Sequence, residues 1–402
     1  MEMYKNIQAK VDAKVSKIKF NNDVNYDRGL WWLFIILLLI GLIAVSSASL
    51  SEAEKITHDP FYFIKRDLAY IILGITLCLF VVNIPMKNWE KYCVPLFLLT
   101  IVLLVIVLTG IGKDTKGAAR WIPLGFANFQ PAELAKLTLI CFLASYFNRR
   151  YDDVRTKKLS MIKPFLVMGI MGGLLLLQPD LGSTVVLFVI TFGMLYISGA
   201  KKIQFLGLVA IGSVLFVLAV YLEPYRLNRV ISFLHPFENY HNSGYQLSQS
   251  LMAFGRGGWL GEGLGNSIQK LSYLPEAHTD FVLAIIGEEF GLVGILTIIL
   301  LLSLLVIKGM IIGKDSLILN QRFKGFFAFG ISFWILFQGF VNLGVALGML
   351  PTKGLTFPLV SYGGSSLIIM SMTIGVLLRI DYENRQQFKQ EKMSTLNTGI
   401  NK

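Results

Sequence analysis

Residues 30–48 read LWWLFIILLLIGLIAVSSA and contain no charged side chain. A helix needs roughly 20 apolar residues to cross the hydrocarbon core of a bilayer, so this run is long enough to span it. The polar segment 1–28 precedes the run, which is too long for the apolar region of a cleavable signal peptide. We therefore expect an uncleaved first transmembrane helix.

Similar runs follow along the 402 residues, of which 54% are hydrophobic and only 15% are charged. Soluble domains carry about 25% charged residues, so this composition excludes disordered and ordinary globular proteins. We expect an all-α, polytopic membrane protein with about ten transmembrane helices. The expected spans are 30–48, 68–84, 93–111, 131–147, 163–178, 182–198, 204–222, 281–306, 324–349 and 357–379.

The chain is expected to have three parts. Residues 1–28 and 381–402 form cytoplasmic tails, and residues 29–380 form the membrane domain, with a long outer loop at 223–280 between the seventh and eighth spans. Most of the 37 Lys and Arg residues fall in segments that this topology places in the cytoplasm. Because this is the positive-inside pattern, the net charge of +12 sets the topology and does not indicate a nucleic-acid partner.

Several common kinds of site are not supported by the sequence. Cys78, Cys93 and Cys141 lie in or beside spans and form neither a disulfide framework nor a paired-cysteine metal site. The stretch GRGGWLGEGLG at 255–265 follows no strand, so it does not predict a dinucleotide site. Just before it, residues 244–254 have the spacing of an amphipathic helix at the membrane surface or across the bundle.

The segment PEAHTDF, residues 275–281, directly precedes the eighth span. Thr279 or Asp280 could cap the free N–H groups of that helix. The position also suits catalysis, because Asp280 would lie at the water–lipid boundary with His278 two residues before it. A lone carboxylate suffices as general base when the leaving group is a pyrophosphate, which departs without being protonated. Both interpretations stay open at this point.

Basic side chains gather in the outer segments. Arg120 lies beside Trp121 in the loop 112–130, Arg226 opens the long loop, and Lys353 lies in PTKGLTFP. Arg offers bidentate contacts to phosphate, and Lys offers a point charge. Such residues are commonly anchors at the lipid surface, but their position next to Gly, Pro and Trp favours anion binding.

Charged side chains at membrane depth cost several kcal/mol unless they are paired or face water. Glu133 and Lys136 share one face of a helix, where they form a self-neutralising pair or where Lys136 holds a phosphate. Glu288 and Glu289 point about 100° apart on a helix and cannot share one environment. We expect at least one of them to be buried against a polar or basic partner on a neighbouring span, in a structural or conformational role.

Eight longer motifs lie along the chain. They are KGAARWIPLG at 116–125, QPAELAKL at 130–137, QPDLGS at 178–183, EPYRLNRV at 223–230, GYQLSQSLMAFGRGG at 244–258, GLGNSIQKLSYLPEAHTDF at 263–281, GEE at 287–289 and MLPTKGLTFPLVSYGGSS at 349–366. Because it carries these motifs in this order, the chain resembles the SEDS family (shape, elongation, division and sporulation). The PTKGLT sequence within its last motif is similar to that of the cell-division members of the family. The resemblance runs from the first span to the last and leaves out residues 1–28 and 385–402.

The resemblance implies a peptidoglycan glycosyltransferase that polymerises lipid II into β-1,4-linked glycan strands during septal cell-wall synthesis. It makes Asp280 the general base that deprotonates the GlcNAc 4-hydroxyl of the incoming lipid II. That oxygen would attack the MurNAc anomeric carbon of the lipid-linked strand, and undecaprenyl pyrophosphate would leave. The residues expected to bind substrate or pyrophosphate are Arg120, Lys136, Arg226, His278 and Lys353. The residues expected to have structural or activating roles are Glu133, Asp180, Glu288 and Glu289.

The implied partners are lipid II, the polyprenyl-linked glycan strand, a class B penicillin-binding transpeptidase, other division proteins and membrane lipids. No metal-ligand cluster is expected, and assistance by a divalent cation is left open. The expected location is the bacterial cytoplasmic membrane at the division septum, with both termini cytoplasmic. Two rival functions are a lipid II flippase and a non-catalytic division scaffold. A flippase should place charges along a path through the bilayer, whereas the polar motifs here cluster on the outer side.

Overall fold

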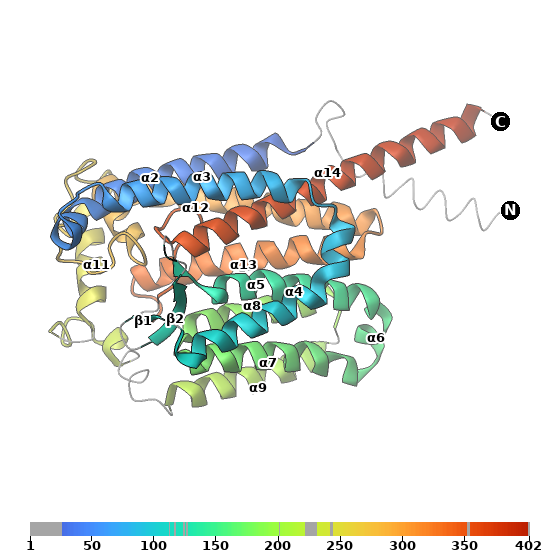
Figure 1. Cartoon of the computed structure of the whole chain (residues 1–402), viewed down its shortest axis with the longest axis horizontal. Helices are drawn as coiled ribbons and strands as arrows, with labels where there is room; N and C mark the ends of the chain where they lie inside the picture. Colours follow the sequence, from blue (N-terminus) through green and yellow to red (C-terminus); the bar gives the residue numbers. More distant parts are fainter. Residues whose placement is uncertain are drawn as a thin grey trace.

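The computed structural model describes residues 26–400 except 112, 116–117, 124, 126–127, 201, 222–230, 242–243 and 352–353. Within that part of the chain every predicted span overlaps a helix, and these helices form one bundle (Figure 1). They are α2 Arg28–Thr57, α3 Tyr62–Val82, α4 Met86–Ile106, α5 Pro131–Arg149, α7 Ile162–Leu177, α8 Leu181–Ile197, α9 Lys202–Tyr221, α12 Val282–Ile318, α13 Arg322–Ala346 and α14 Gly364–Ile400.

Five of these helices are long and apolar enough to cross a membrane: α2, α4 with its continuation to Thr109, α12, α13 and α14. The helices α7 and α8 are apolar but shorter. The predicted all-α membrane fold is therefore confirmed, while the count of ten crossings stays a prediction.

The start of α2 shows how local sequence sets a helix boundary. Asp27 is the N-cap, and its Oδ1 atom accepts hydrogen bonds from the backbone N–H of Gly29 at 2.8 Å and of Leu30 at 3.2 Å. These bonds satisfy donors that have no partner within the helix. The helix ends at His58, which adopts the left-handed conformation. The predicted N-terminal tail was expected to end at residue 28, and the first helix of the structure begins at Arg28.

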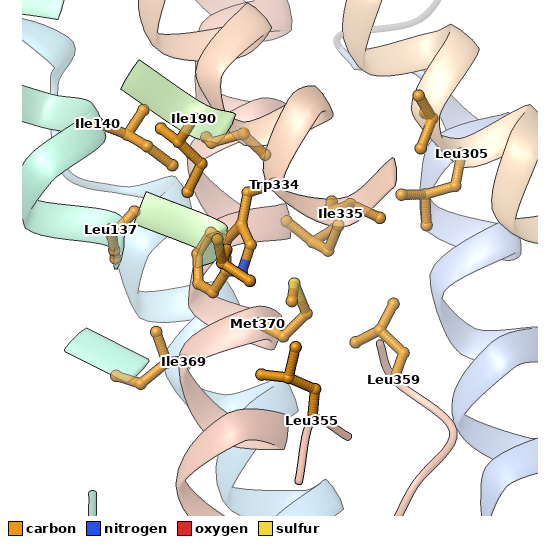
Figure 2. Close-up of a cluster of buried hydrophobic side chains, with 14 of the residues drawn as sticks. Leu137, Ile140, Ile190, Leu305, Trp334, Ile335, Leu355, Leu359, Ile369 and Met370 are labelled. Atoms are coloured by element: carbon orange, nitrogen blue, oxygen red, sulfur yellow. The ribbon is translucent and has the colours of Figure 1, made fainter. Parts of the chain in front are cut away.

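The helix α13 lies in the core of the bundle, where it packs against α12, α5 and α8. Trp334 in its middle is fully buried, and the apolar side chains around it come from several helices (Figure 2). The indole Nε1–H donates to Gln338 Oε1 at 2.7 Å, so the single polar atom of the ring is satisfied inside the core. The neighbours drawn around it are Leu137, Ile140, Ile190, Ile335, Leu355, Ile369 and Met370.

Short elements gather at one end of the bundle, opposite the end from which α14 projects (Figure 1). A small antiparallel sheet joins β1 Lys113–Thr115, β2 Ala118–Pro123 and β3 Asn128–Phe129. The helix α11 Tyr245–Gly257 coincides with the amphipathic helix predicted at 244–254 and packs across α12. We call this the outer end, because the predicted topology places it outside the cytoplasm. A π-helix at Val107–Ile111 adjoins β2, whereas α6 at Tyr151–Thr156, with a 3-10 helix at Lys158–Met161 beside it, lies at the opposite end of the bundle (Figure 1).

The last helix differs from its predicted span. The span was expected to begin at residue 357, but that start was wrong, because α14 begins at Gly364. Residues 354–363 instead make turns at the outer end, where Pro358 cannot donate a backbone hydrogen bond. At its other end α14 continues to Ile400, so no helix break marks the tail predicted at 381–402 (Figure 1).

Candidate active site

Asp280 lies in the last turn before α12 and is half-buried. The N-cap position of α12 belongs to Phe281, which offers no side-chain hydrogen bond. Thr279 instead donates its hydroxyl to Glu276 Oε2 at 2.9 Å. Neither Thr279 nor Asp280 therefore occupies the cap position, and the structure does not have the capping arrangement that the sequence left open.

The backbone around Asp280 is tied to α13 and to the segment before α14. The amide of Asn342 on α13 donates to the Asp280 carbonyl at 2.8 Å and to the Leu355 carbonyl at 2.6 Å. Gly354 passes so close that a Cβ atom placed on it would lie 3.1 Å from Asp280 Oδ2. The Asp280 carboxylate thus faces the segment that follows Lys353, although Lys353 itself lies outside the described residues.

His278 is buried at the outer end of the bundle. Its ring packs against Phe63 at 4.4 Å and Tyr362 at 5.4 Å between ring centroids. Its Nδ1 atom lies 3.1 Å from Glu52 Oε2, in a geometry that makes no hydrogen bond. The imidazole therefore faces α2 and α3, and its expected contact with substrate stays a prediction.

Arg120 on β2 reaches the turn that begins α8. Its guanidinium donates to the carbonyl of Gln178 at 3.1 Å and to the carbonyl of Pro179. Asp180 in the same turn caps α8, accepting from the N–H of Ser183 at 3.1 Å and from its hydroxyl at 2.7 Å. Arg120 therefore contacts the turn that leads into Asp180, the N-cap of α8. Arg226 lies outside the described residues.

The pair Glu133 and Lys136 is enclosed in the bundle. Lys136 is fully buried, and its Nζ atom donates to Glu133 Oε1 at 2.8 Å and to Gln338 Oε1 at 2.9 Å. It also lies 5.2 Å from the centroid of the Trp334 ring. Because buried charges need such partners, the geometry favours the self-neutralising pair over a phosphate contact.

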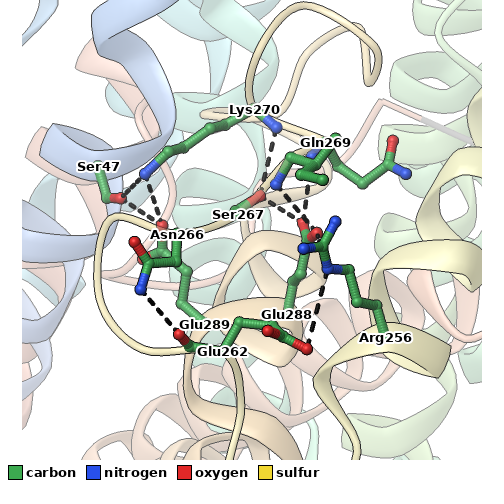
Figure 3. A network of polar contacts seen from close by, with 10 residues as sticks. Ser47, Arg256, Glu262, Asn266, Ser267, Gln269, Lys270, Glu288 and Glu289 are labelled. Atoms are coloured by element: carbon green, nitrogen blue, oxygen red, sulfur yellow. Dashed lines mark hydrogen bonds and ion pairs between the residues drawn. The ribbon is translucent and has the colours of Figure 1, made fainter.

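Glu288 and Glu289 are both buried on α12, each with a basic partner (Figure 3). The Glu288 carboxylate accepts hydrogen bonds from the Ser267 hydroxyl and from two backbone N–H groups, those of Ile268 at 3.0 Å and Gln269 at 3.2 Å. The Nε atom of Arg256 on α11 lies 3.7 Å from it.

Glu289 takes its partners from a different direction. Its Oε1 atom accepts from Lys270 Nζ at 2.8 Å and from the hydroxyl of Ser47 on α2 at 2.6 Å, and Lys270 also donates to Ser47 at 2.9 Å (Figure 3). Sequence reasoning expected a polar or basic partner on a neighbouring span, and Ser47 on α2 is such a partner, but it did not identify Lys270 in the outer loop or Arg256 on α11. The signal available was the cost of a buried carboxylate, which demands a nearby cation without indicating which one.

The glycine-rich stretch 257–263 docks into a break in α12. Gly291 has φ 64° and ψ −162°, a conformation that interrupts the helix and that glycine tolerates. The loop N–H groups of Glu262 and Gly263 donate to the exposed carbonyls of Glu288 and Glu289, each at 2.9 Å. A side chain at Gly261 would collide with the Glu289 carbonyl. The repeated glycines therefore allow backbone to pack on backbone, which explains a motif that fits no nucleotide site.

No group of three or more His, Cys, Asp or Glu side chains converges as a metal site among the residues that the structure describes. The three cysteines are buried and unpaired. The involvement of a divalent cation therefore stays open.

Comparison with known proteins identifies the family. The family model of cell cycle proteins named for FtsW, RodA and SpoVE matches residues 28–386. The chain is 65% identical over 361 residues to the "Probable peptidoglycan glycosyltransferase FtsW" of Pasteurella multocida (strain Pm70), and the match covers 90% of this chain and 91% of that relative.

Solved structures agree with this match. The fold is similar to a chain from the structure described as "Structural coordination of polymerization and crosslinking by a peptidoglycan synthase complex", with a TM-score of 0.74, 30% identity, and coverage of 89% of this chain and 98% of that one. It is also similar to the rod shape determining protein RodA of Thermus thermophilus, with a TM-score of 0.66, 28% identity, and coverage of 90% and 97%. The chain belongs to the FtsW, RodA and SpoVE family of cell cycle proteins.

Proposed function

We propose that the protein is a peptidoglycan glycosyltransferase that polymerises lipid II at the outer face of the cytoplasmic membrane during cell division. The observation that carries this proposal is the placement of Asp280. Its carboxylate is half-buried at the start of α12, and the chain that follows Lys353 passes beside it. The name of the Pasteurella multocida relative supports the same activity.

In the proposed reaction Asp280 takes the proton from the GlcNAc 4-hydroxyl of lipid II. The oxygen then attacks the MurNAc anomeric carbon of the growing strand, and a β-1,4 bond forms as the bond to undecaprenyl pyrophosphate breaks. The pyrophosphate needs no proton to leave, so one carboxylate is enough. In this proposal Arg120, Lys353 and Arg226 supply the positive charge that offsets the leaving group.

The buried carboxylates have a different proposed role. Glu133, Glu288 and Glu289 each pair with a cation inside the protein and hold the bundle and the outer loop in place. Asp180 holds the turn that Arg120 contacts by accepting a hydrogen bond from the Ser183 hydroxyl. These residues support the site without touching the reacting atoms.

The proposed partner is a class B penicillin-binding transpeptidase that crosslinks the strands. The similar synthase structure, described as coordinating polymerization and crosslinking, supports this pairing. The proposed location is the cytoplasmic membrane at the septum, with both termini in the cytoplasm, together with other division proteins.

The test is to incubate the purified protein and its transpeptidase partner with lipid II in detergent or liposomes. Glycan strands on a gel, absent with Asp280→Asn, are the expected result. Transfer of labelled lipid II between leaflets without strand formation would show a flippase instead. If neither glycan strands nor transfer of lipid II is observed, only the role of a non-catalytic division scaffold is left.

A further inference from the structure

Asn342 joins two outer segments that are distant in the sequence. It lies on α13 and is 2% exposed. The carbonyls that it binds belong to Asp280 and Leu355, at 2.8 Å and 2.6 Å. One turn earlier on the same helix, Gln338 donates to the carbonyl of Thr356 at 3.0 Å. The outer half of α13 therefore presents two buried amides to the backbone of these segments.

The chemistry of this contact depends on the amide being a donor. A primary amide has two N–H donors, and both are used here on carbonyl oxygens. The Oδ1 atom of Asn342 is buried without a hydrogen-bond partner among the described residues. Rotating the amide by half a turn would place an oxygen against two carbonyl oxygens, so only this orientation satisfies the backbone.

The contact sets the position of the Asp280 carboxylate. Asn342 holds the Asp280 and Leu355 backbones to one point, and Gly354 lies against Asp280 Oδ2. We propose that Asn342 is a positioning residue for glycosyl transfer, which keeps the general base aligned with the segment 354–356. This proposal rests on the proposed function, because it needs Asp280 to be the base. A displacement of about 1 Å from the reactive geometry costs roughly 100-fold in rate.

The test uses three variants. Asn342→Asp keeps the shape but replaces the donor group with an acceptor, and Asn342→Gln keeps both donors but moves them by one methylene. Asn384→Asp is the matched control, because Asn384 is also fully buried and its amide donates to Ile312 at 3.3 Å and Ser316 at 2.8 Å. Those partners lie in the last two turns of α12, which begins at Val282 and ends at Ile318, so they are far from Asp280.

The expected kinetic result is a fall of roughly 100-fold in kcat for strand formation with Asn342→Asp, with KM for lipid II unchanged. Asn342→Gln should lie between this variant and the wild type. Asn384→Asp should lower the melting temperature by a similar amount but leave kcat unchanged. Equal kcat losses in Asn342→Asp and Asn384→Asp, or a wild-type kcat in Asn342→Asp, would overturn the proposal.

A second measurement does not depend on activity. Hydrogen exchange of the peptides covering 275–283 and 354–361 should become faster in Asn342→Asp and stay unchanged in Asn384→Asp. Unchanged exchange in Asn342→Asp would overturn the positioning role even if activity were lost. If the exchange changes as expected while the wild type makes no strands, the anchoring holds and the proposed glycosyltransferase function fails.

Discussion

Two acidic regions, one inside α12 and one in the turn just before it, differ in how their carboxylates are placed. Glu288 and Glu289, inside α12, are buried and saturated by cations, hydroxyls and backbone N–H groups. Asp280, in the turn before this helix, is half-buried, and its backbone carbonyl accepts a hydrogen bond from Asn342. Glu288 and Glu289 are sealed from a substrate, whereas Asp280 is partly exposed at the outer end. This difference in exposure separates the scaffold carboxylates from the candidate base.

The largest effect is expected from Asp280→Asn. The change keeps the size of the side chain and removes its basicity, so strand formation should fall by roughly 100- to 10,000-fold. Melting temperature and membrane insertion should stay close to those of the wild type. The measurement is glycan product per time at saturating lipid II. Wild-type yield from this variant would show that Asp280 is not the base.

The next effect concerns the buried pair of Glu289 and Lys270. Removing Glu289 as Glu289→Ala leaves a buried ammonium unpaired, which typically costs about 3–5 kcal/mol of folding stability. The paired replacement Glu289→Leu with Lys270→Met should recover most of that loss. Thermal unfolding of Glu289→Leu, Lys270→Met and the double variant measures the coupling. Additive losses would mean that the two side chains do not depend on each other.

A smaller effect is expected at the outer cations. Arg120→Ala removes two hydrogen bonds to the turn at Gln178 and Pro179, and activity should fall roughly tenfold. Arg120→Lys should restore only part of it, because the planar fork is lost. Lys353→Ala should lose activity to a similar degree. Full activity in both alanine variants would mean that these residues are anchors at the lipid surface.

The smallest effect is expected from Glu288→Gln. The N–H groups of Ile268 and Gln269 bind different oxygens of Glu288, so the single amide oxygen of Gln keeps only one of these bonds, while Arg256 is partly exposed and water can solvate its freed charge. Stability should fall by about 1–3 kcal/mol, the cost of one unsatisfied buried donor, and activity should change less than twofold. The comparison is with Asp280→Asn in the same assay. A stable but inactive Glu288→Gln would move Glu288 into the chemistry.

Much of the fold was readable from the sequence. Uninterrupted apolar runs located the helices because a bilayer demands roughly 20 such residues at a stretch, whatever they pack against. The amphipathic spacing located α11 for a similarly local reason. The start of α14 was placed too early because 357–363 is apolar enough to pass as helix, while its turns are set by contacts such as that between the N–H of Phe357 and the Ser361 hydroxyl.

The sequence by itself also identified Asp280 as a candidate site residue, because the position of a carboxylate at the boundary of an apolar span can be recognised from the sequence alone. Only the tertiary structure decided which charges are neutralised and by what. Lys270 and Glu289 are 19 residues apart, and Asn342 and Asp280 are 62 apart. No helical or strand period connects such positions. Their contact depends on how the glycine-rich loop docks into the break in α12 and on how α13 packs against α12. Local patterning therefore determined where the helices and polar segments lie, and the packing of distant segments determined what each polar side chain does.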